Sequence, residues 1–172
     1  MSISSPPLVS VSAALHTARV DSPLGPLWVQ CDGAVITGLS FQPSGAPETA
    51  VPAVLDEARR QLDAYFARRL HRFQLPLARS GSRSQLLVRE ALEQVPYGTA
   101  TTYQALADRL GGTVVARAVG NACARNPRPI IVPCHRVLSS RGELTGYIGG
   151  LAAKQWLLEH EGVLAKALFE VG

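Results

Sequence analysis

Residues 101–124 read TTYQALADRLGGTVVARAVGNACA, two short helical patterns separated by a pair of glycines. A threonine at the start of the stretch can cap a first helix over 103–110, and Gly111 can end that helix. Thr113 can then cap a second helix that runs to the end of the stretch. Two short helices joined by a glycine turn form a helix-turn-helix, which we predict over 102–124. A generic helical hairpin would give the same pattern.

The second of these helices has two different faces when its residues are placed at 100° steps. The outward face is small except for one guanidinium, that of Arg117. Such a helix can approach another surface closely and project one long side chain into it, although an ordinary solvated arginine is the alternative. The face expected to pack inward consists of Val115, Ala118, Val119 and Ala122, and the outward face of Arg117, Asn121 and Ala124.

The first half of the chain has a strand-rich pattern. Residues 17–31 and 34–41 are β-rich runs broken by turns that contain glycine, proline and aspartate, which is typical of a hairpin at the edge of a sheet. Residues 57–70 then show an amphipathic helical pattern with cations on the outer face. Strands followed by helices predict a mixed α/β (α+β) protein.

A short polar stretch, Arg79–Ser84, is a plausible linker between two domains. We therefore predict an N-terminal α/β domain over 1–82 and a C-terminal domain over 83–172. The apolar, serine-rich start of the chain, residues 1–16, is expected to form a loosely ordered arm.

The composition fits a folded protein without a membrane span. Of the 172 residues, 47% are hydrophobic, and no apolar run approaches the ~20 residues that cross a bilayer. Residues 1–20 lack the basic start and the continuous apolar run of a signal peptide, so we expect a cytoplasmic protein with no membrane partner. The net charge of +4 suits a nucleic-acid partner, although many basic proteins bind none.

The chain has three cysteines, Cys31, Cys123 and Cys134. Three cysteines cannot form a closed disulfide framework, and the absence of a CxxC pair gives no support to a zinc site. Three free, inert thiols are the simplest interpretation, so a functional role must follow from the surroundings of one of them.

Residues 126–137 read NPRPIIVPCHRV and place Cys134 in a proline-stiffened frame. A free thiol is mostly protonated at neutral pH and needs a nearby base or positive field to act as a nucleophile. His135 follows directly, but neighbours on a strand point to opposite faces. The chain must therefore turn at Pro133–Cys134 for the imidazole to reach the sulfur, directly or through a water. A buried structural cysteine, or a Cys–His pair kept for packing, would fit the same residues.

Two features downstream could complete such a site. The glycines of GYIGG at 146–150 would let backbone amides approach a ligand closely. Glu161 ends a predicted terminal helix over 151–162, and a carboxylate that orients a histidine would complete a Cys–His–Glu relay. A solvated acid at a helix end is the alternative for Glu161.

The residues of this half closely resemble those of the O6-alkylguanine-DNA alkyltransferases, also called methylated-DNA–protein-cysteine methyltransferases. The resemblance runs without a break through 116–162 and is carried by the PCHRV box at 133–137, the NP before it and the GYxGG after it. Weaker similarity covers SPLGPL at 22–27, AYFARRLHRFQLPL at 64–77 and VPYGTATTYQALADRLG at 95–111.

The resemblance implies a small RNase-H-like N-terminal domain and a helical C-terminal domain that bears the helix-turn-helix and an active-site segment, 126–150. It implies a DNA repair protein that irreversibly transfers the alkyl group of O6-alkylguanine in double-stranded DNA to Cys134, with O4-alkylthymine as an open second substrate. The target nucleotide would be flipped out from the minor-groove side. The protein would be a monomer that acts once, without a cofactor, a metal or a small-molecule methyl donor.

The resemblance also assigns the reactive roles. Cys134 corresponds to the alkyl acceptor, and His135 to the base that takes its proton through a water. Glu161 corresponds to the carboxylate that polarises the histidine. Asn126 corresponds to the hinge asparagine between the helix-turn-helix and the active-site segment.

The remaining roles concern DNA and the base pocket. Arg117 resembles the arginine finger that fills the space left by the flipped guanine, and Tyr103 the tyrosine that contacts the base and a neighbouring phosphate. Further DNA contacts are expected from Gln104, Asn121 and Ser140, and the pocket wall from the backbone of Val137 and from Tyr147 and Ile148.

The sequence also departs from the family pattern. Ser84-Gln85 and Val88-Arg89 stand where Phe-Gln and Val-Trp are usual, and Gly98-Thr99-Ala100 replaces the usual Gly-Glu-Thr turn. These changes concern the packing between the domains rather than the reactive residues.

Three other functions remain as alternatives. An alkyltransferase-like protein would sense damage without repairing it, but such proteins lack the acceptor cysteine. A helix-turn-helix regulator would not need the segment around Cys134, and a cysteine hydrolase would turn over.

Overall fold

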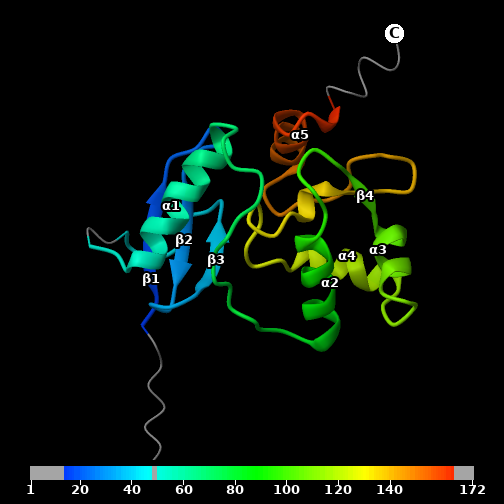
Figure 1. Cartoon of the computed structure of the whole chain (residues 1–172), viewed down its shortest axis with the longest axis horizontal. Helices are drawn as coiled ribbons and strands as arrows, with labels where there is room; N and C mark the ends of the chain where they lie inside the picture. Colours follow the sequence, from blue (N-terminus) through cyan, green and yellow to red (C-terminus); the bar gives the residue numbers. More distant parts are fainter. Residues whose placement is uncertain (1–13, 48–49, 165–172) are drawn as a thin grey trace, which may run out of the picture.

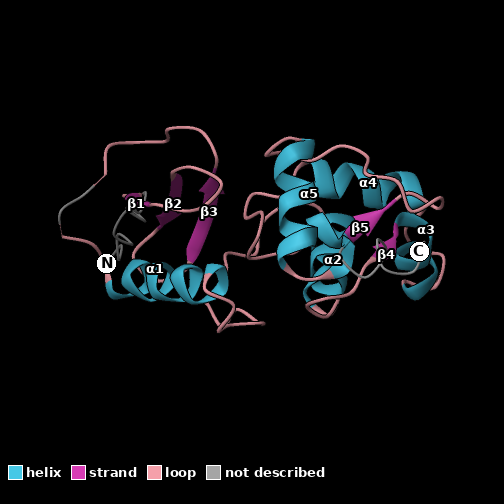
Figure 2. Cartoon of the chain, turned by 90° about the horizontal axis from the view of Figure 1, so that it is seen from above, coloured by secondary structure: helices cyan, strands magenta, loops and turns pink. Residues whose placement is uncertain are grey.

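The computed structural model describes residues 14–47 and 50–164, which form two parts that lie side by side (Figures 1 and 2). One part is a three-stranded sheet covered by a helix, and the other is mainly helical. The mixed α/β fold class predicted from the sequence is therefore confirmed. No helix within the described residues is long and apolar enough to cross a membrane.

The sheet is antiparallel, with β1 (His16–Val20), β2 (Leu27–Cys31) and β3 (Ile36–Ser40) in that order. Alternate residues of β2 are buried, as expected for a strand with one face on a core. The turn into β3 is fixed by the Asp32 carboxylate, which accepts hydrogen bonds from the backbone amides of Ala34 and Val35, both at 2.9 Å. His16 pairs with Cys31 and therefore belongs to the sheet, not to the arm expected over 1–16. Residues 1–13 of that expected arm lie outside the described residues.

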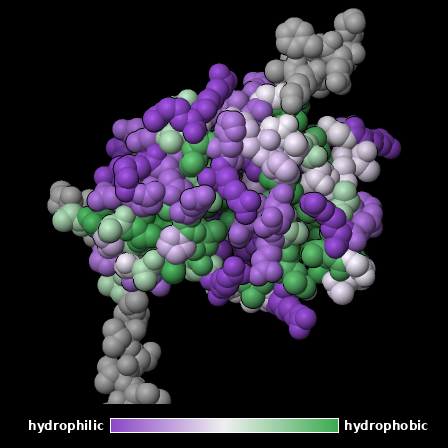
Figure 3. Space-filling view, viewed as in Figure 1, coloured by the Kyte–Doolittle hydropathy of each residue, from purple (hydrophilic) through white to green (hydrophobic). Residues whose placement is uncertain are grey.

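The helix α1 (Ala53–Phe66) packs on β1 and β2. Its inner face buries Leu55, Leu62 and Tyr65. Hydrophilic side chains gather over α1 and the turn after it in the space-filling view (Figure 3), as the cationic outer face of the predicted helix requires.

The helical part is built from short elements that end at capped or glycine-containing turns. A capping box starts α2 because Ser82 and Gln85 each bond the other's backbone amide, and the Thr102 hydroxyl accepts from the backbone amide of Ala105 at the start of α3. The turn from α3 to α4 contains Gly111 and Gly112, both with positive φ. The elements are α2 (Arg83–Glu93), β4 (Thr101–Thr102), α3 (Tyr103–Arg109), α4 (Ala116–Ala124), the 3₁₀ turn η1 (Cys134–Arg136), β5 (Val137–Leu138) and α5 (Leu151–His160).

The start of α4 differs from the prediction. Thr113 does not cap this helix: its hydroxyl donates to the carbonyl of Leu110 at 2.7 Å, and Val115 occupies the N-cap position. Because the helix begins after Val115, this side chain does not join the inward face but is 64% exposed, and Val114 is buried instead. Val119 and Ala122 are buried as expected.

Two apolar cores hold the molecule together. The first lies between the sheet and α1, and the second lies among α2, α3 and α4. The first core also contains Ile130 and Ile131 from the active-site segment and Leu157 from α5. The segment that carries Cys134 is thus fixed by both parts of the protein.

Candidate active site

The backbone that precedes Cys134 is held by the buried side-chain amide of Asn126. The side chain of Asn126 accepts a hydrogen bond from the backbone amide of Arg128 at 3.1 Å and donates to the carbonyl of Val132 at 2.9 Å. Its amide nitrogen also lies 3.2 Å from the sulfur of Cys134, as a donor. Between these contacts Ile130 adopts φ 73°, a left-handed conformation that a β-branched residue reaches only when its surroundings impose it. The rigid frame predicted from the prolines is present.

The 3₁₀ turn η1 directs consecutive side chains to different sides. Cys134 lies at the wall of a cavity of about 410 Å³, while His135 and Arg136 point to a buried cluster around Glu161. The cavity is lined by residues of α3, α4, the turn and the 145–148 loop: Tyr103, Gly120, Cys123, Ala124, Cys134, Thr145, Gly146, Tyr147 and Ile148.

The far wall of this cavity is a loop held from behind by Lys154. This lysine of α5 is almost fully buried, and its ammonium donates to the carbonyls of Thr145 at 2.9 Å and Gly146 at 3.3 Å. The hydroxyl of Tyr103 reaches the same loop, 3.2 Å from the Thr145 hydroxyl. The loop is therefore positioned by side chains from two helices.

The segment that follows β3 braces the same loop. The ring of Tyr147 meets that of Phe41 edge to face, with centroids 5.9 Å apart. A Cβ atom at Gly149 would lie 2.7 Å from two ring carbons of Phe41, too close for any side chain. Glycine at this position is what lets the loop approach the sheet.

Behind the turn, Glu161 accepts hydrogen bonds from three side chains. Tyr65 and His135 reach Oε1 at 2.8 Å, and Arg136 binds both carboxylate oxygens, at 2.8 and 2.9 Å. Burial by itself opposes ionisation, but the bonds from His135 and Arg136 outweigh it and hold the pKa of Glu161 well below its ordinary value. Glu161 is therefore an anion at neutral pH.

This anion sets the protonation of His135. An ionised carboxylate can only accept, so we infer that Nε2 of His135 carries the hydrogen and donates it to Glu161. Burial lowers the pKa of His135 more than its carboxylate partner raises it, so the ring is neutral at neutral pH. Nδ1 then carries a lone pair, and it has no hydrogen-bond partner among the described protein atoms. A buried basic nitrogen one residue from Cys134 is suited to accept a proton.

The sulfur of Cys134 is not held as a thiolate in the resting protein. Cys134 is 3% exposed, and burial raises its pKa, although the Asn126 amide and the nearby charge of Lys154 oppose the shift. The resting group is a thiol, and its ionisation has to accompany the reaction. Cys123 lies in the same cavity, and burial raises its pKa to about 12.

The structure brings seven of the predicted site residues together. Tyr103, Tyr147 and Ile148 join Cys134 at the cavity, and His135, Glu161 and Asn126 surround the turn. The other predicted residues lie apart from this group: Arg117 and Asn121 are exposed on α4, Gln104 bonds Asp108 on α3, Ser140 lies in a turn, and Val137 is buried in β5 outside the cavity lining.

Sequence reasoning missed three residues that contact the site. The amphipathic pattern over 57–70 accounts for the burial of Tyr65 but not for its hydroxyl on Glu161, a contact between residues 96 positions apart. Arg136 directly follows the histidine, but its ion pair with Glu161 is not visible from that neighbourhood. Lys154 could have been found from the sequence as the one cation on the buried face of α5.

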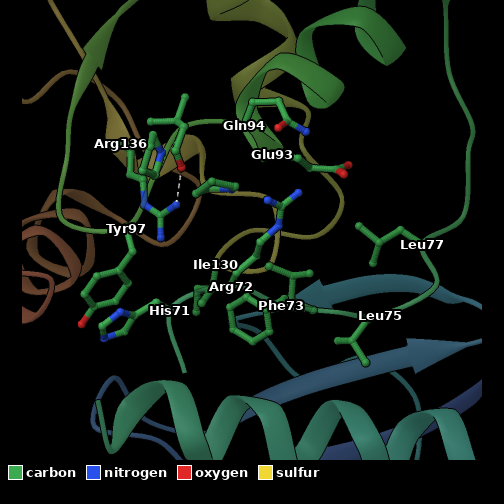
Figure 4. Close-up of a pocket in the computed structure, with 14 residues that line it drawn as sticks. His71, Arg72, Phe73, Leu75, Leu77, Glu93, Gln94, Tyr97, Ile130 and Arg136 are labelled. Carbon is green, nitrogen blue, oxygen red and sulfur yellow. Dashed lines mark hydrogen bonds between the residues drawn. The ribbon is translucent and has the colours of Figure 1, made fainter. Parts of the chain in front are cut away.

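A second cavity of about 390 Å³ lies on the other side of η1, between the two parts of the protein (Figure 4). Arg136 crosses its edge and donates to the carbonyl of Val95 at 2.6 Å. The rings of His71 and Tyr97 stack at its mouth, with centroids 4.1 Å apart. No group of residues suited to hold a metal ion occurs in the described ranges.

Two family models match the chain. Residues 15–79 match the 6-O-methylguanine DNA methyltransferase ribonuclease-like domain. Residues 83–163 match the 6-O-methylguanine DNA methyltransferase DNA binding domain. The first match agrees with the RNase-H-like N-terminal fold that the resemblance implied.

Curated relatives and solved structures agree with these matches. The methylated-DNA–protein-cysteine methyltransferase of Mycobacterium tuberculosis H37Rv is 43% identical over 152 residues, covering 86% of this chain and 92% of the relative. That of Methanosarcina acetivorans is 41% identical over 155 residues, covering 86% and 99%. The crystal structure of the M. tuberculosis O6-methylguanine methyltransferase superposes with a TM-score of 0.78 at 40% identity, covering 86% and 93%. A structure titled as the M. tuberculosis protein in complex with DNA gives 0.76 at 42% identity, covering 85% and 92%.

Proposed function

The chain belongs to the methylated-DNA–protein-cysteine methyltransferase family, and from this premise we propose that it repairs DNA by moving the alkyl group of O6-alkylguanine onto its own Cys134. The observation that carries the proposal is the position of this sulfur. It lies at the wall of a cavity of about 410 Å³, one residue from a histidine whose Nε2 is held by Glu161. A nucleophile, a base and an orienting carboxylate thus occur in one turn and one helix end.

The chemistry follows from the protonation states. Nδ1 of His135 takes the thiol proton through a water, and the positive ring that results is stabilised by the Glu161 carboxylate. The Cys134 thiolate attacks the alkyl carbon, the bond from that carbon to O6 breaks, and the electron pair stays on guanine, which regains a proton. The product is a thioether, which no nearby group hydrolyses. Each molecule therefore acts once, and the DNA itself is the alkyl donor.

The DNA is approached by α4. Its exposed face is small apart from Arg117, which is free to enter the duplex and fill the space of the extruded guanine. O6 is buried in the paired stack, so the nucleotide must leave the helix before the sulfur can reach it. Tyr103 lies at the cavity mouth, between this helix and the loop wall, in a position to contact the flipped base. We assign the further DNA contacts to Gln104, Asn121 and Ser140. We place the boundary between the two domains within the linker, after residue 82.

Intact-protein mass spectrometry after incubation with an O6-methylguanine duplex tests the proposal. We expect one methyl group per protein, located on Cys134 by peptide mapping and absent in Cys134→Ser. Binding without a mass change would identify a damage sensor, and demethylated DNA in excess of protein would identify a hydrolase. An O4-methylthymine duplex run in parallel shows whether the cavity accepts the second substrate.

A further inference from the structure

Two buried arginines lie together outside the site described above. Arg89 on α2 is 6% exposed and Arg128, in the segment before the turn, is 2% exposed. Both line a cavity of about 290 Å³ between α2 and residues 75–79. This cavity adjoins the one in Figure 4, and the two share Leu75, Leu77 and Glu93.

Neither guanidinium has a carboxylate partner. Arg89 donates to the carbonyl of Ser80, and Arg128 donates to the carbonyl of Thr37 at 3.4 Å. The Nε atoms of both arginines are buried and have no partner among the described residues, and neither arginine forms an ion pair within those residues. Buried charges are normally paired, because removing a charge from water without a compensating partner is strongly unfavourable.

The acidic groups nearby do not supply the missing charge. Glu90 is engaged by Arg79 at 2.6 Å. Glu93 lines the same cavity and raises the pKa of Arg128, but it does not reach ion-pair distance. Burial lowers the pKa of both arginines, and the charge of Arg89 lowers the pKa of Arg128 further, yet an arginine stays protonated in proteins. The cavity therefore holds two positive charges against one unpaired carboxylate.

We propose that this cavity binds a small tetrahedral oxyanion, with inorganic phosphate as the chemical type, between the guanidinium groups of Arg89 and Arg128. The two guanidinium groups would donate to anion oxygens, since arginine forms strong, charge-assisted hydrogen bonds with phosphate. Arg89 stands where the family usually has tryptophan, so the site is a property of this chain rather than of the repair reaction.

The position of the site gives the anion a structural role. It joins α2, the linker at Ser80 and the active-site segment, three elements that come from both parts of the protein. The backbone amide of Arg128 donates to Asn126, whose side chain also contacts the acceptor sulfur. An anion on Arg128 would therefore stabilise the frame that positions Cys134.

Isothermal titration of the full chain with inorganic phosphate, at constant ionic strength maintained with chloride, tests the site. We expect saturable binding of one phosphate per protein and a rise in melting temperature that chloride does not produce. Arg89→Trp and Arg128→Gln should each weaken phosphate binding at least tenfold. Arg60→Gln, which removes an exposed arginine on α1, is the matched control and should bind as the unchanged protein does.

Three outcomes would overturn the proposal: no saturable binding to the unchanged protein, equal affinity in Arg89→Trp, or equal losses in Arg60→Gln. If a variant does not fold, titration of the unchanged protein decides alone, with dimethyl phosphate as a second ligand. Binding of the inorganic ion but not of the diester identifies free phosphate as the source. Equal binding of both identifies a nucleic-acid phosphate.

Discussion

The η1 turn directs adjacent residues to two sides, an open cavity and a buried ionic cluster. On the cavity side, Cys134 lies at the wall of an open volume that residues 145–148 also line. On the other side, Glu161 pairs with the charge of Arg136 and accepts a hydrogen bond from the neutral His135, in a buried cluster. One side is arranged for access and the other for electrostatic balance.

This difference predicts how substitutions should behave. A change on the cavity side removes a contact with DNA or with the reacting group, so it should alter the rate of repair and leave unfolding nearly unchanged. A change in the buried cluster leaves a charge without its partner, so it should alter stability as well as rate. The five predictions below, on four variants, test this separation, starting with the largest effect.

Glu161→Gln should destabilise the protein by about 3–5 kcal/mol, because it leaves the buried guanidinium of Arg136 unpaired. Urea unfolding measures the loss. Glu159→Gln, a change of the neighbouring exposed acid on α5, is the control and should cost little. Glu161→Gln should also raise the pKa of Cys134, measured from the pH dependence of the reaction rate with free O6-benzylguanine. An unchanged pH–rate profile would remove Glu161 from the relay.

The same variant has a distinct acid dependence. The pKa of Glu161 is lower in the folded protein than in the unfolded chain, so its contribution to stability is present above about pH 4.3 and is lost as the pH falls below that value. Glu161→Gln should therefore flatten this part of the curve of stability against pH. Curves of equal slope for the two proteins would mean that the cluster does not hold the carboxylate as described.

Arg117→Ala tests the cavity side. Unstacking a nucleotide costs a few kcal/mol, which an inserted side chain partly offsets, so repair of duplex DNA should slow roughly ten- to hundredfold. The reaction with free O6-benzylguanine and the free energy of unfolding should not change. Equal losses on both substrates would assign Arg117 to the fold rather than to the duplex.

Lys154→Met tests a residue that is buried yet acts on the cavity side. Its ammonium supports the loop wall and opposes the rise in the pKa of Cys134. Its loss should slow the reaction with free O6-benzylguanine roughly tenfold at neutral pH, or about 1.4 kcal/mol in the barrier, and move the pH–rate profile to higher pH. Lys154→Arg keeps the charge and should recover part of the rate. A slower rate with an unmoved profile would reduce Lys154 to a support for the loop.

Tyr65→Phe should give the smallest effect, about 1 kcal/mol in urea unfolding, because Glu161 keeps its bonds from His135 and Arg136. The hydroxyl is the contact of α1 with the cluster. A loss as large as that of Glu161→Gln would show that the N-terminal part, rather than the ion pair, holds the carboxylate.

Local patterns predicted the elements that depend on neighbouring residues. The β-rich runs, the amphipathic α1 and a threonine cap before α3 all follow from a few consecutive side chains. The start of α4 was predicted wrongly because Thr113 is a favourable N-cap residue by type, but its hydroxyl donates back to Leu110 and the helix begins two residues later, after Val115.

The site was only partly predictable for a related reason. The acceptor, the base and the carboxylate were expected from the family resemblance, and the structure places them as one group. Its surroundings could not be read from the sequence, because Tyr65 and Glu161 meet only once both parts of the chain have folded. The raised pKa of Cys134 likewise depends on burial, which adjacent residues do not reveal.

The contact between Gly149 and Phe41 bears on substrate range if Cys134 acts as proposed. The ring follows β3 and packs on Tyr147, so it supports the wall of the cavity without being one of its lining residues. Trimming this ring should let the wall retreat, and we expect the protein then to accept bulkier adducts with every lining side chain intact. Selectivity could thus be changed from a position outside the cavity.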